Sequence, residues 1–268
     1  MRYRVPSRLA DRGVSPRWFV ASLLAVLTLI AASQSVDAAP GSEPARSGKG
    51  VTVAVIGDSL GDGVWSGFSL MWRNKPECKV VRRSKIGAGM TRADFPRWQQ
   101  DLAAELAAES VDVAVLMFGL NDQTGIRDEH RRGFLFKTEG WKQLYQARIE
   151  SLVRDLVQRK VVVVWLGLPV MRSTELNAGA RWINGLVEEK LKALGVVYVP
   201  LERDFANPEG EFQPYLQDEA SQRNRQIRLE DGIHFTHYGY ELIAAKARAA
   251  IRQALLARDP GLQDAFAC

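Results

Sequence analysis

Strand-like and helix-like segments alternate along the chain from residue 51 onward. Five short runs rich in valine and other apolar residues predict strands, and such runs are typical of parallel strands buried on both faces. They are Val51–Ile56, Lys79–Arg83, Val111–Phe118, Val161–Leu166 and Val196–Leu201. Between and after them, apolar positions at helical spacing predict helices at about 61–73, 94–109, 141–159, 176–194 and 238–256.

This alternation predicts the α/β class, with one doubly wound, flavodoxin-like domain around a five-stranded parallel sheet. The expected strand order is 2-1-3-4-5, which places the first and third strands side by side at the switch point where such sheets bind ligands. Two connections, 123–140 and 203–230, exceed the usual length. We expect both on the ligand-binding side, as walls or a lid, and the alternative is a solvated surface insertion.

Three short motifs bring chemistry to this framework. Gly57-Asp58-Ser59-Leu60 follows the first strand, Gly119-Leu120-Asn121-Asp122 follows the third, and Asp231-Gly232-Ile233-His234 precedes the last helix. A serine, an amide, a carboxylate and a histidine are the groups that acyl transfer through a tetrahedral intermediate requires. The motifs therefore predict a serine esterase.

In this order, the motifs resemble the SGNH (GDSL) hydrolases, which are named for Ser, Gly, Asn and His residues in separate blocks. The resemblance extends from the first strand to about residue 256. It implies that Ser59 is the nucleophile, that His234 is the base and that Asp231 orients the base. It also implies that no metal and no organic cofactor takes part.

The same resemblance implies an oxyanion hole with three donors. Two of them are the backbone N–H of Ser59 and the side chain of Asn121. The third is the backbone N–H of a glycine after the second strand, where the chain contains Gly87 and Gly89. Gly89 is the preferred residue because it lies nearer the following helix, and Gly87 is the alternative register.

Several of these residues also have interpretations without catalysis. Ser59 could cap a helix, and Asn121 could be a turn residue. His237 is expected to cap the last helix or to line the rim of the site, with a smaller chance of being the base, and His130 is expected to be solvated.

Two alternative sites use the same residues differently. The string Gly57-Asp58-Ser59-Leu60-Gly61 also fits the nucleophile elbow of α/β-hydrolases, but no earlier strand precedes it to donate an oxyanion N–H. Asp58, Asp62, Asp122 and Asp231 could instead form a metal site for phosphoester hydrolysis. That interpretation leaves Asn121 and the Asp-X-X-His pair without a role.

The beginning of the chain differs in kind from the rest. Residues 1–38 contain five arginines, an apolar run at about 18–32 and a small-residue exit, which predict a secretory signal, with an uncleaved membrane anchor as the alternative. Residues 39–50 form a linker, and 51–268 form the hydrolase-like domain. We therefore expect an exported protein, periplasmic or secreted.

Charge and cysteine content limit the partners. The net charge is +5, but the leader holds five Arg and two Asp, so the remainder carries only +2. No nucleic acid partner is expected, and membrane contact is expected only if the leader stays uncleaved. Cys78 and Cys268 could form one disulfide in an oxidising compartment or remain two free thiols.

The expected function is hydrolysis of acyl esters through an acyl-Ser59 intermediate that water resolves. The family resemblance implies an O-acetylated envelope or extracellular carbohydrate as substrate, either a small molecule or a polysaccharide. An O-acyltransferase, a lipase or a thioesterase could use the same site. A non-catalytic polysaccharide-binding or assembly protein is the alternative outside enzymes. The oligomeric state is not indicated.

Overall fold

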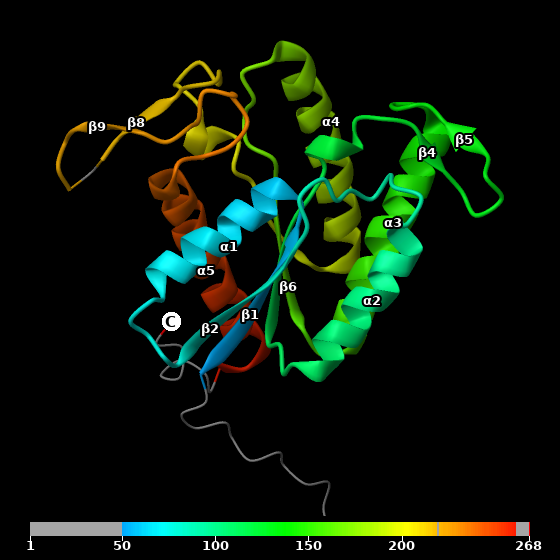
Figure 1. Cartoon of the computed structure of the whole chain (residues 1–268), viewed down its shortest axis with the longest axis horizontal. Helices are drawn as coiled ribbons and strands as arrows, with labels where there is room; N and C mark the ends of the chain where they lie inside the picture. Colours follow the sequence, from blue (N-terminus) through cyan, green and yellow to red (C-terminus); the bar gives the residue numbers. More distant parts are fainter. Residues whose placement is uncertain (1–49, 219, 261–267) are drawn as a thin grey trace, which may run out of the picture. The chain divides into compact units, whose positions relative to one another are not determined.

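The five predicted apolar runs form one parallel sheet in the computed structural model, which describes residues 50–218, 220–260 and 268 (Figure 1). The strand order is β2-β1-β3-β6-β7, which confirms the predicted 2-1-3-4-5 order because β6 and β7 are the fourth and fifth strands of this sheet. The strands are β1 (Val51–Gly57), β2 (Cys78–Ser84), β3 (Val113–Met117), β6 (Val162–Leu166) and β7 (Val197–Val199).

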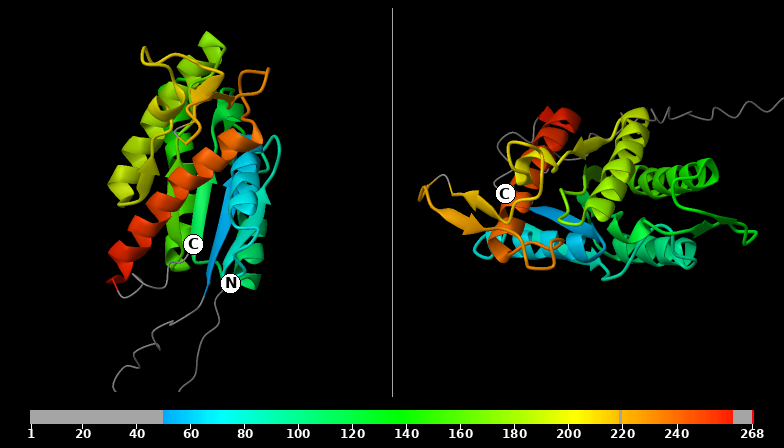
Figure 2. Two further views of the ribbon diagram at one scale, coloured as in Figure 1. Left: turned by 90° about the vertical axis from the view of Figure 1, so that its left-hand side faces the viewer. Right: turned by 90° about the horizontal axis from the view of Figure 1, so that it is seen from above.

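Helices cover both faces of the sheet (Figure 2). On one face, α1 (Ser59–Met71) packs along α5 (His237–Arg258). The other face is covered by α2 (Phe95–Ala108), α3 (Glu139–Gln158) and α4 (Thr174–Leu194). The arrangement is the predicted doubly wound α/β architecture.

Polar side chains mark where four helices begin. Each accepts a hydrogen bond from a backbone N–H of the first helical turn, a group that has no partner within the helix. The residues are Asp58 for α1, Thr138 for α3, Ser173 for α4 and Thr236 for α5. Because Asp58 caps α1, this helix begins at Ser59, two residues before the predicted start.

Both long connections contain short antiparallel hairpins. The first holds β4 (Ile126–Arg127) and β5 (Gly133–Phe134), after the 3₁₀ turn η1 (Leu120–Asp122). The second holds β8 (Tyr215–Gln217) and β9 (Asn224–Gln226), after the 3₁₀ turn η2 (Arg203–Phe205). Both hairpins lie at the end of the sheet where the strands terminate (Figure 1), as predicted for these connections. Strands of two or three residues are too short for a recognisable sequence period, so the hairpins themselves were not predicted.

A disulfide joins Cys78, the first residue of β2, to Cys268, with Cα atoms 5.6 Å apart. The two cysteines are therefore paired rather than free. The predicted leader, and the linker up to residue 49, lie outside the described residues. Within the described part of the chain, no helix is both long and apolar enough to cross a membrane.

Removing this disulfide should destabilise the domain. The bond closes a loop with a sequence separation of 190 residues. Loss of a native disulfide typically costs about 2–5 kcal/mol, in part because the unfolded chain regains conformational entropy. Cys268→Ser should therefore unfold at a lower temperature than the wild type in a thermal melt. Reductant should lower the wild-type Tm towards that of the variant and leave the variant unchanged. Equal melting temperatures of the wild type with and without reductant would contradict the prediction.

Candidate active site

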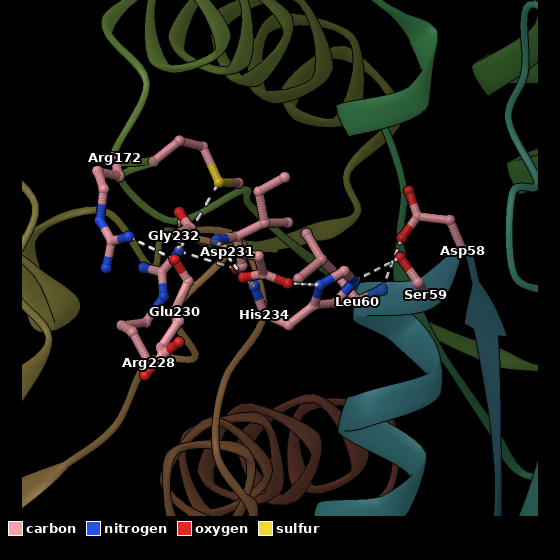
Figure 3. A network of polar contacts seen from close by, with 11 residues as sticks. Asp58, Ser59, Leu60, Arg172, Arg228, Glu230, Asp231, Gly232 and His234 are labelled. Carbon is pink, nitrogen blue, oxygen red and sulfur yellow. Dashed lines mark hydrogen bonds and ion pairs between the residues drawn. The ribbon is translucent and has the colours of Figure 1, made fainter.

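Two of the motifs meet in a continuous chain of hydrogen bonds (Figure 3). Ser59 Oγ lies 2.8 Å from His234 Nε2, and His234 Nδ1 lies 2.6 Å from Asp231 Oδ2. Ser59 is the first residue of α1, whereas the other two residues lie in the loop before α5. The packing of α1 along α5 thus brings together residues that are 175 positions apart.

Asp231 is held as a hydrogen-bond acceptor by its own turn. Its Oδ1 accepts the backbone N–H groups of Ile233 at 2.8 Å and His234 at 2.9 Å. Partial burial acts to raise the pKa of Asp231, but the hydrogen bonds from His234 and from these amides outweigh it, and the pKa is lowered. The carboxylate therefore stays charged, faces the imidazole and fixes the tautomer with hydrogen on Nδ1.

The residue before the serine begins the helix. Asp58 is buried, and its Oδ1 accepts the N–H of Leu60 at 2.9 Å. The cap of α1 is thus Asp58, and the alternative of Ser59 as the cap is wrong. As the first helical residue, Ser59 has a backbone N–H without an acceptor inside the helix, so this N–H is free to meet an oxyanion.

Burial gives Asp58 an unusual titration. Removal from water penalises the charged carboxylate and raises the pKa of Asp58 to about 7, and the nearby charge of Asp122 acts in the same direction. In the described part of the chain, the Oδ2 atom of Asp58 is buried without a hydrogen-bond partner. A carboxyl group that changes its protonation state near neutral pH therefore lies directly beside the serine.

Asn121 contacts the glycine loop that follows β2. Its Nδ2 donates one hydrogen to the carbonyl of Ala88 at 3.0 Å, which leaves the second hydrogen for another acceptor. The amide nitrogen of Gly89 belongs to the same peptide unit as that carbonyl, so it lies at most about 5 Å from Asn121 Nδ2. The glycine and asparagine blocks are therefore neighbours, as the family resemblance implied.

The two glycines have different surroundings. A Cβ atom built on Gly89 would lie 2.4 Å from Asp122 Oδ1, so no side chain fits there. Gly87 has φ +73° in a turn closed by the Ala88 N–H and the Lys85 carbonyl, and a Cβ there would meet nothing within 4 Å. Gly89, not Gly87, is thus the glycine packed against the Asn121 block.

Asp122 joins this glycine loop to α3. Its Oδ1 accepts the backbone N–H of Thr91 at 2.9 Å and the Thr91 hydroxyl at 3.0 Å, and its Oδ2 accepts the hydroxyl of Tyr145 at 3.0 Å. The sequence did not predict this role. The sequence feature that could have indicated it is the carboxylate directly after Asn121, at the end of a buried strand, because a buried aspartate requires hydrogen-bond donors.

The four aspartates of the alternative metal site take separate roles. Asp62 pairs with Arg82, with Oδ1 and Nε 2.6 Å apart, while Asp58, Asp122 and Asp231 have the contacts given above. Among the described residues, no group of three or more His, Cys, Asp or Glu side chains is placed to hold a metal ion.

The other two histidines lie outside the hydrogen-bonded chain. His237 is exposed at the start of α5, where the hydroxyl of Thr236 accepts the N–H of Gly239 at 3.2 Å. The expectation that His237 caps this helix is therefore wrong, because Thr236 does so. His130 is exposed, with Nε2 3.5 Å from Glu129, in line with its predicted solvation.

The strand order and the place of the motifs define the fold of the SGNH (GDSL) hydrolases. The chain is similar to a GDSL-like lipase from Bacteroides thetaiotaomicron, at 16% identity and TM-score 0.52 over 76% of this chain and 88% of the other. It is similar to an α/β hydrolase from the metagenome of Lake Arreo, at 19% identity and TM-score 0.52 over 76% of this chain and 95% of the other. It is also similar to an acetyl-xylooligosaccharide esterase variant from Geobacillus, at 17% identity and TM-score 0.53 over 76% of this chain and 95% of the other.

The family model described as "Protein of unknown function (DUF459)" matches residues 52–250, and the chain belongs to this family. No curated protein matches the chain in sequence. The solved structures confirm the predicted fold.

Asp58 should make the stability of the domain depend on pH. Its pKa rises from the ordinary value of 3.8 to about 7 on folding, so the folded state holds a proton that the unfolded state releases. The contribution of Asp58 to the free energy of unfolding is complete below pH 3.8, where both states hold the proton. It is lost as pH rises above that value and through about 7, by up to about 4 kcal/mol. Asp58→Asn is neutral and keeps the helix cap, so it should lose less stability over this range.

Urea unfolding of the wild type and the variant at several pH values measures this difference. Asp101→Asn, which changes an exposed carboxylate on α2, is the control and should follow the wild type. If Asp58→Asn shows the same slope with pH as the wild type, the protonated state of Asp58 is refuted.

Proposed function

We propose that this protein is a serine esterase whose catalytic residues are Ser59, His234 and Asp231. The observation that carries the proposal is the chain of hydrogen bonds from the serine hydroxyl through the imidazole to the carboxylate, at 2.8 and 2.6 Å. A hydroxyl is a weak nucleophile at neutral pH and needs an adjacent base. His234 is placed to remove its proton, and Asp231 to stabilise the imidazolium that forms.

In the first step, Ser59 Oγ attacks the ester carbonyl carbon while its proton passes to His234 Nε2. The tetrahedral intermediate then breaks its bond to the alcohol oxygen, which takes that proton from the imidazolium. This leaves an acyl-Ser59 ester and a free alcohol. Water, deprotonated by the same imidazole, then attacks the acyl carbon to form a second tetrahedral intermediate. This intermediate breaks its bond to Ser59 Oγ, which takes the proton back from the imidazolium, and the acid is released.

The oxyanion of both intermediates would be stabilised by three N–H donors. These are the free side-chain hydrogen of Asn121 and the backbone N–H groups of Ser59 and Gly89. The side-chain donor is fixed in advance by the bond from Asn121 to the Ala88 carbonyl. Preorganised donors need little rearrangement as charge develops, which is why they lower the barrier.

We propose a short acyl group, acetyl, carried by an envelope or extracellular carbohydrate. One solved structure with the same fold is an acetyl-xylooligosaccharide esterase. Export is supported by the leader and by the Cys78–Cys268 disulfide, since such bonds persist in oxidising compartments.

A chromogenic acetyl ester tests the proposal directly. We expect hydrolysis by the wild type, with the rate falling as the acyl chain lengthens. Adding an oligosaccharide acceptor separates hydrolysis from acyl transfer, because transfer would produce an acetylated sugar in place of acetate. No turnover of any ester or thioester, and no labelling by a fluorophosphonate, would contradict the proposed activity.

The catalytic residues should respond as one unit. Ser59→Ala should abolish hydrolysis and fluorophosphonate labelling. His234→Ala should reduce kcat by several orders of magnitude, about 10⁴-fold or more, because the hydroxyl loses its base. His237→Ala is the matched control, three residues further along the chain, and should keep most of the activity. A larger loss in His237→Ala than in His234→Ala would show that the base is assigned to the wrong residue.

Removal of the side-chain oxyanion donor should affect turnover rather than binding. Asn121→Ala should lower kcat by about 10²–10³-fold and leave KM nearly unchanged, because the bond is made mainly in the transition state. Steady-state kinetics on the acetyl ester measure both constants. If KM rises while kcat stays constant, Asn121 binds the ground state or only shapes the turn.

A further inference from the structure

Behind the Asp231–His234 turn lies a fully buried arginine. Arg228 has no exposed surface and sits between two aromatic rings, 4.1 Å from the ring centre of Phe235 and 4.9 Å from that of Phe212. In Figure 3 it lies on the side of the turn away from Ser59. It therefore cannot touch the reacting atoms.

The guanidinium group binds backbone carbonyls from two loops. One Nη atom donates to Val170, in the loop after β6, at 2.8 Å. The other donates to Ile233 at 2.8 Å and to Gly232 at 3.3 Å. The two carbonyls of the second loop belong to the residues between Asp231 and His234, so the arginine holds the segment that sets the separation of these side chains.

A buried cation of this kind adds little net stability. Among the described residues, Arg228 forms no ion pair with a carboxylate, and its Nε has no hydrogen-bond partner. Desolvation lowers the pKa of Arg228 to about 10, which records the cost of burying the charge. Burying a charged group costs free energy, which hydrogen bonds to neutral carbonyls offset only in part. The placement of a guanidinium here therefore needs an explanation other than stability.

We propose that Arg228 is a positioning residue for the catalytic pair, an inference that rests on the proposed esterase activity. Its planar fork fixes the Gly232 and Ile233 carbonyls against the loop after β6. The turn then presents Asp231 to His234 Nδ1, and His234 Nε2 to Ser59 Oγ. Lysine would keep the charge but not the geometry, because an ammonium group is a single point with no planar fork.

The test compares Arg228→Lys with Arg83→Lys. Arg83 is a half-buried arginine that binds Glu105 on α2 and Glu109 directly after this helix, outside the catalytic machinery. We expect Arg228→Lys to lower kcat about 10²-fold with KM unchanged, the typical cost of a displacement of about 1 Å in a catalytic group. Arg83→Lys should keep the wild-type kcat. In Arg228→Ala, added guanidinium ion should restore part of the lost activity, because it refills the vacated space.

A second readout does not depend on turnover. The proton on His234 Nδ1, bonded to Asp231, should give a downfield NMR signal that is assigned by its loss in His234→Ala. We expect this signal to shift or vanish in Arg228→Lys and to persist in Arg83→Lys. If the signal changes in Arg228→Lys and persists in Arg83→Lys while the wild type hydrolyses no ester, the positioning role holds and the proposed function fails.

Other outcomes overturn the inference. An unchanged NMR signal in Arg228→Lys would show that the turn holds its shape without the guanidinium group, whether or not the wild type hydrolyses esters. If the wild type hydrolyses esters, an unchanged kcat in Arg228→Lys would show the same. Loss of folded protein in both Arg228→Lys and Arg228→Ala, judged by circular dichroism, would make Arg228 a folding residue rather than a positioning residue.

Discussion

The packing of α1 against α5 is the constraint on which the candidate site depends. Ser59 is fixed by the start of α1 and His234 by the loop that leads into α5, and the two residues lie 175 positions apart in the sequence. The packing of the facing sides of these two helices brings the serine and the imidazole together, and the contacts within the Asp231–His234 turn then orient the imidazole. Since core packing is dense and rigid, this distance is held closely.

Around this contact the domain buries polar groups that work against its stability. Asp58 and Asp122 are buried carboxyl groups whose pKa values are raised by burial, and Arg228 is a buried cation whose pKa is lowered for the same reason. Each lies behind a different part of the site: the serine, the glycine loop and the Asp–His turn. Desolvation of charged groups is costly unless hydrogen bonds compensate. The site is thus supported by a shell of polar contacts rather than by apolar packing alone.

Much of the fold could be predicted from local patterns. Near-continuous apolar runs such as Val161–Leu166 indicate strands covered on both faces, and the alternation with amphipathic helices then restricts the topology to few choices. The hairpins within 123–140 and 203–230 could not be predicted, because two- and three-residue strands are specified by tertiary contacts. The cap of α5 was within reach of the sequence, because threonine is a preferred capping residue and the hydroxyl of Thr236 accepts the N–H of Gly239 only three residues further on. The interpretation of His237 as a cap or a rim residue overlooked this local signal.

For the site, the sequence by itself determined the chemical groups, since Ser59, Asn121 and the Asp231–His234 pair stand in motifs at the ends of elements that the pattern predicts. The sequence preferred Gly89 over Gly87 because Gly89 lies nearer the following helix, and the tertiary structure decided between the two because only Gly89 packs against Asn121 and Asp122. The tertiary structure likewise decided the roles of Asp122 and Arg228. Their partners, Tyr145 and the Val170 carbonyl, lie 23 and 58 residues away along the chain, and contacts of that kind form only when the packed elements bring distant segments together.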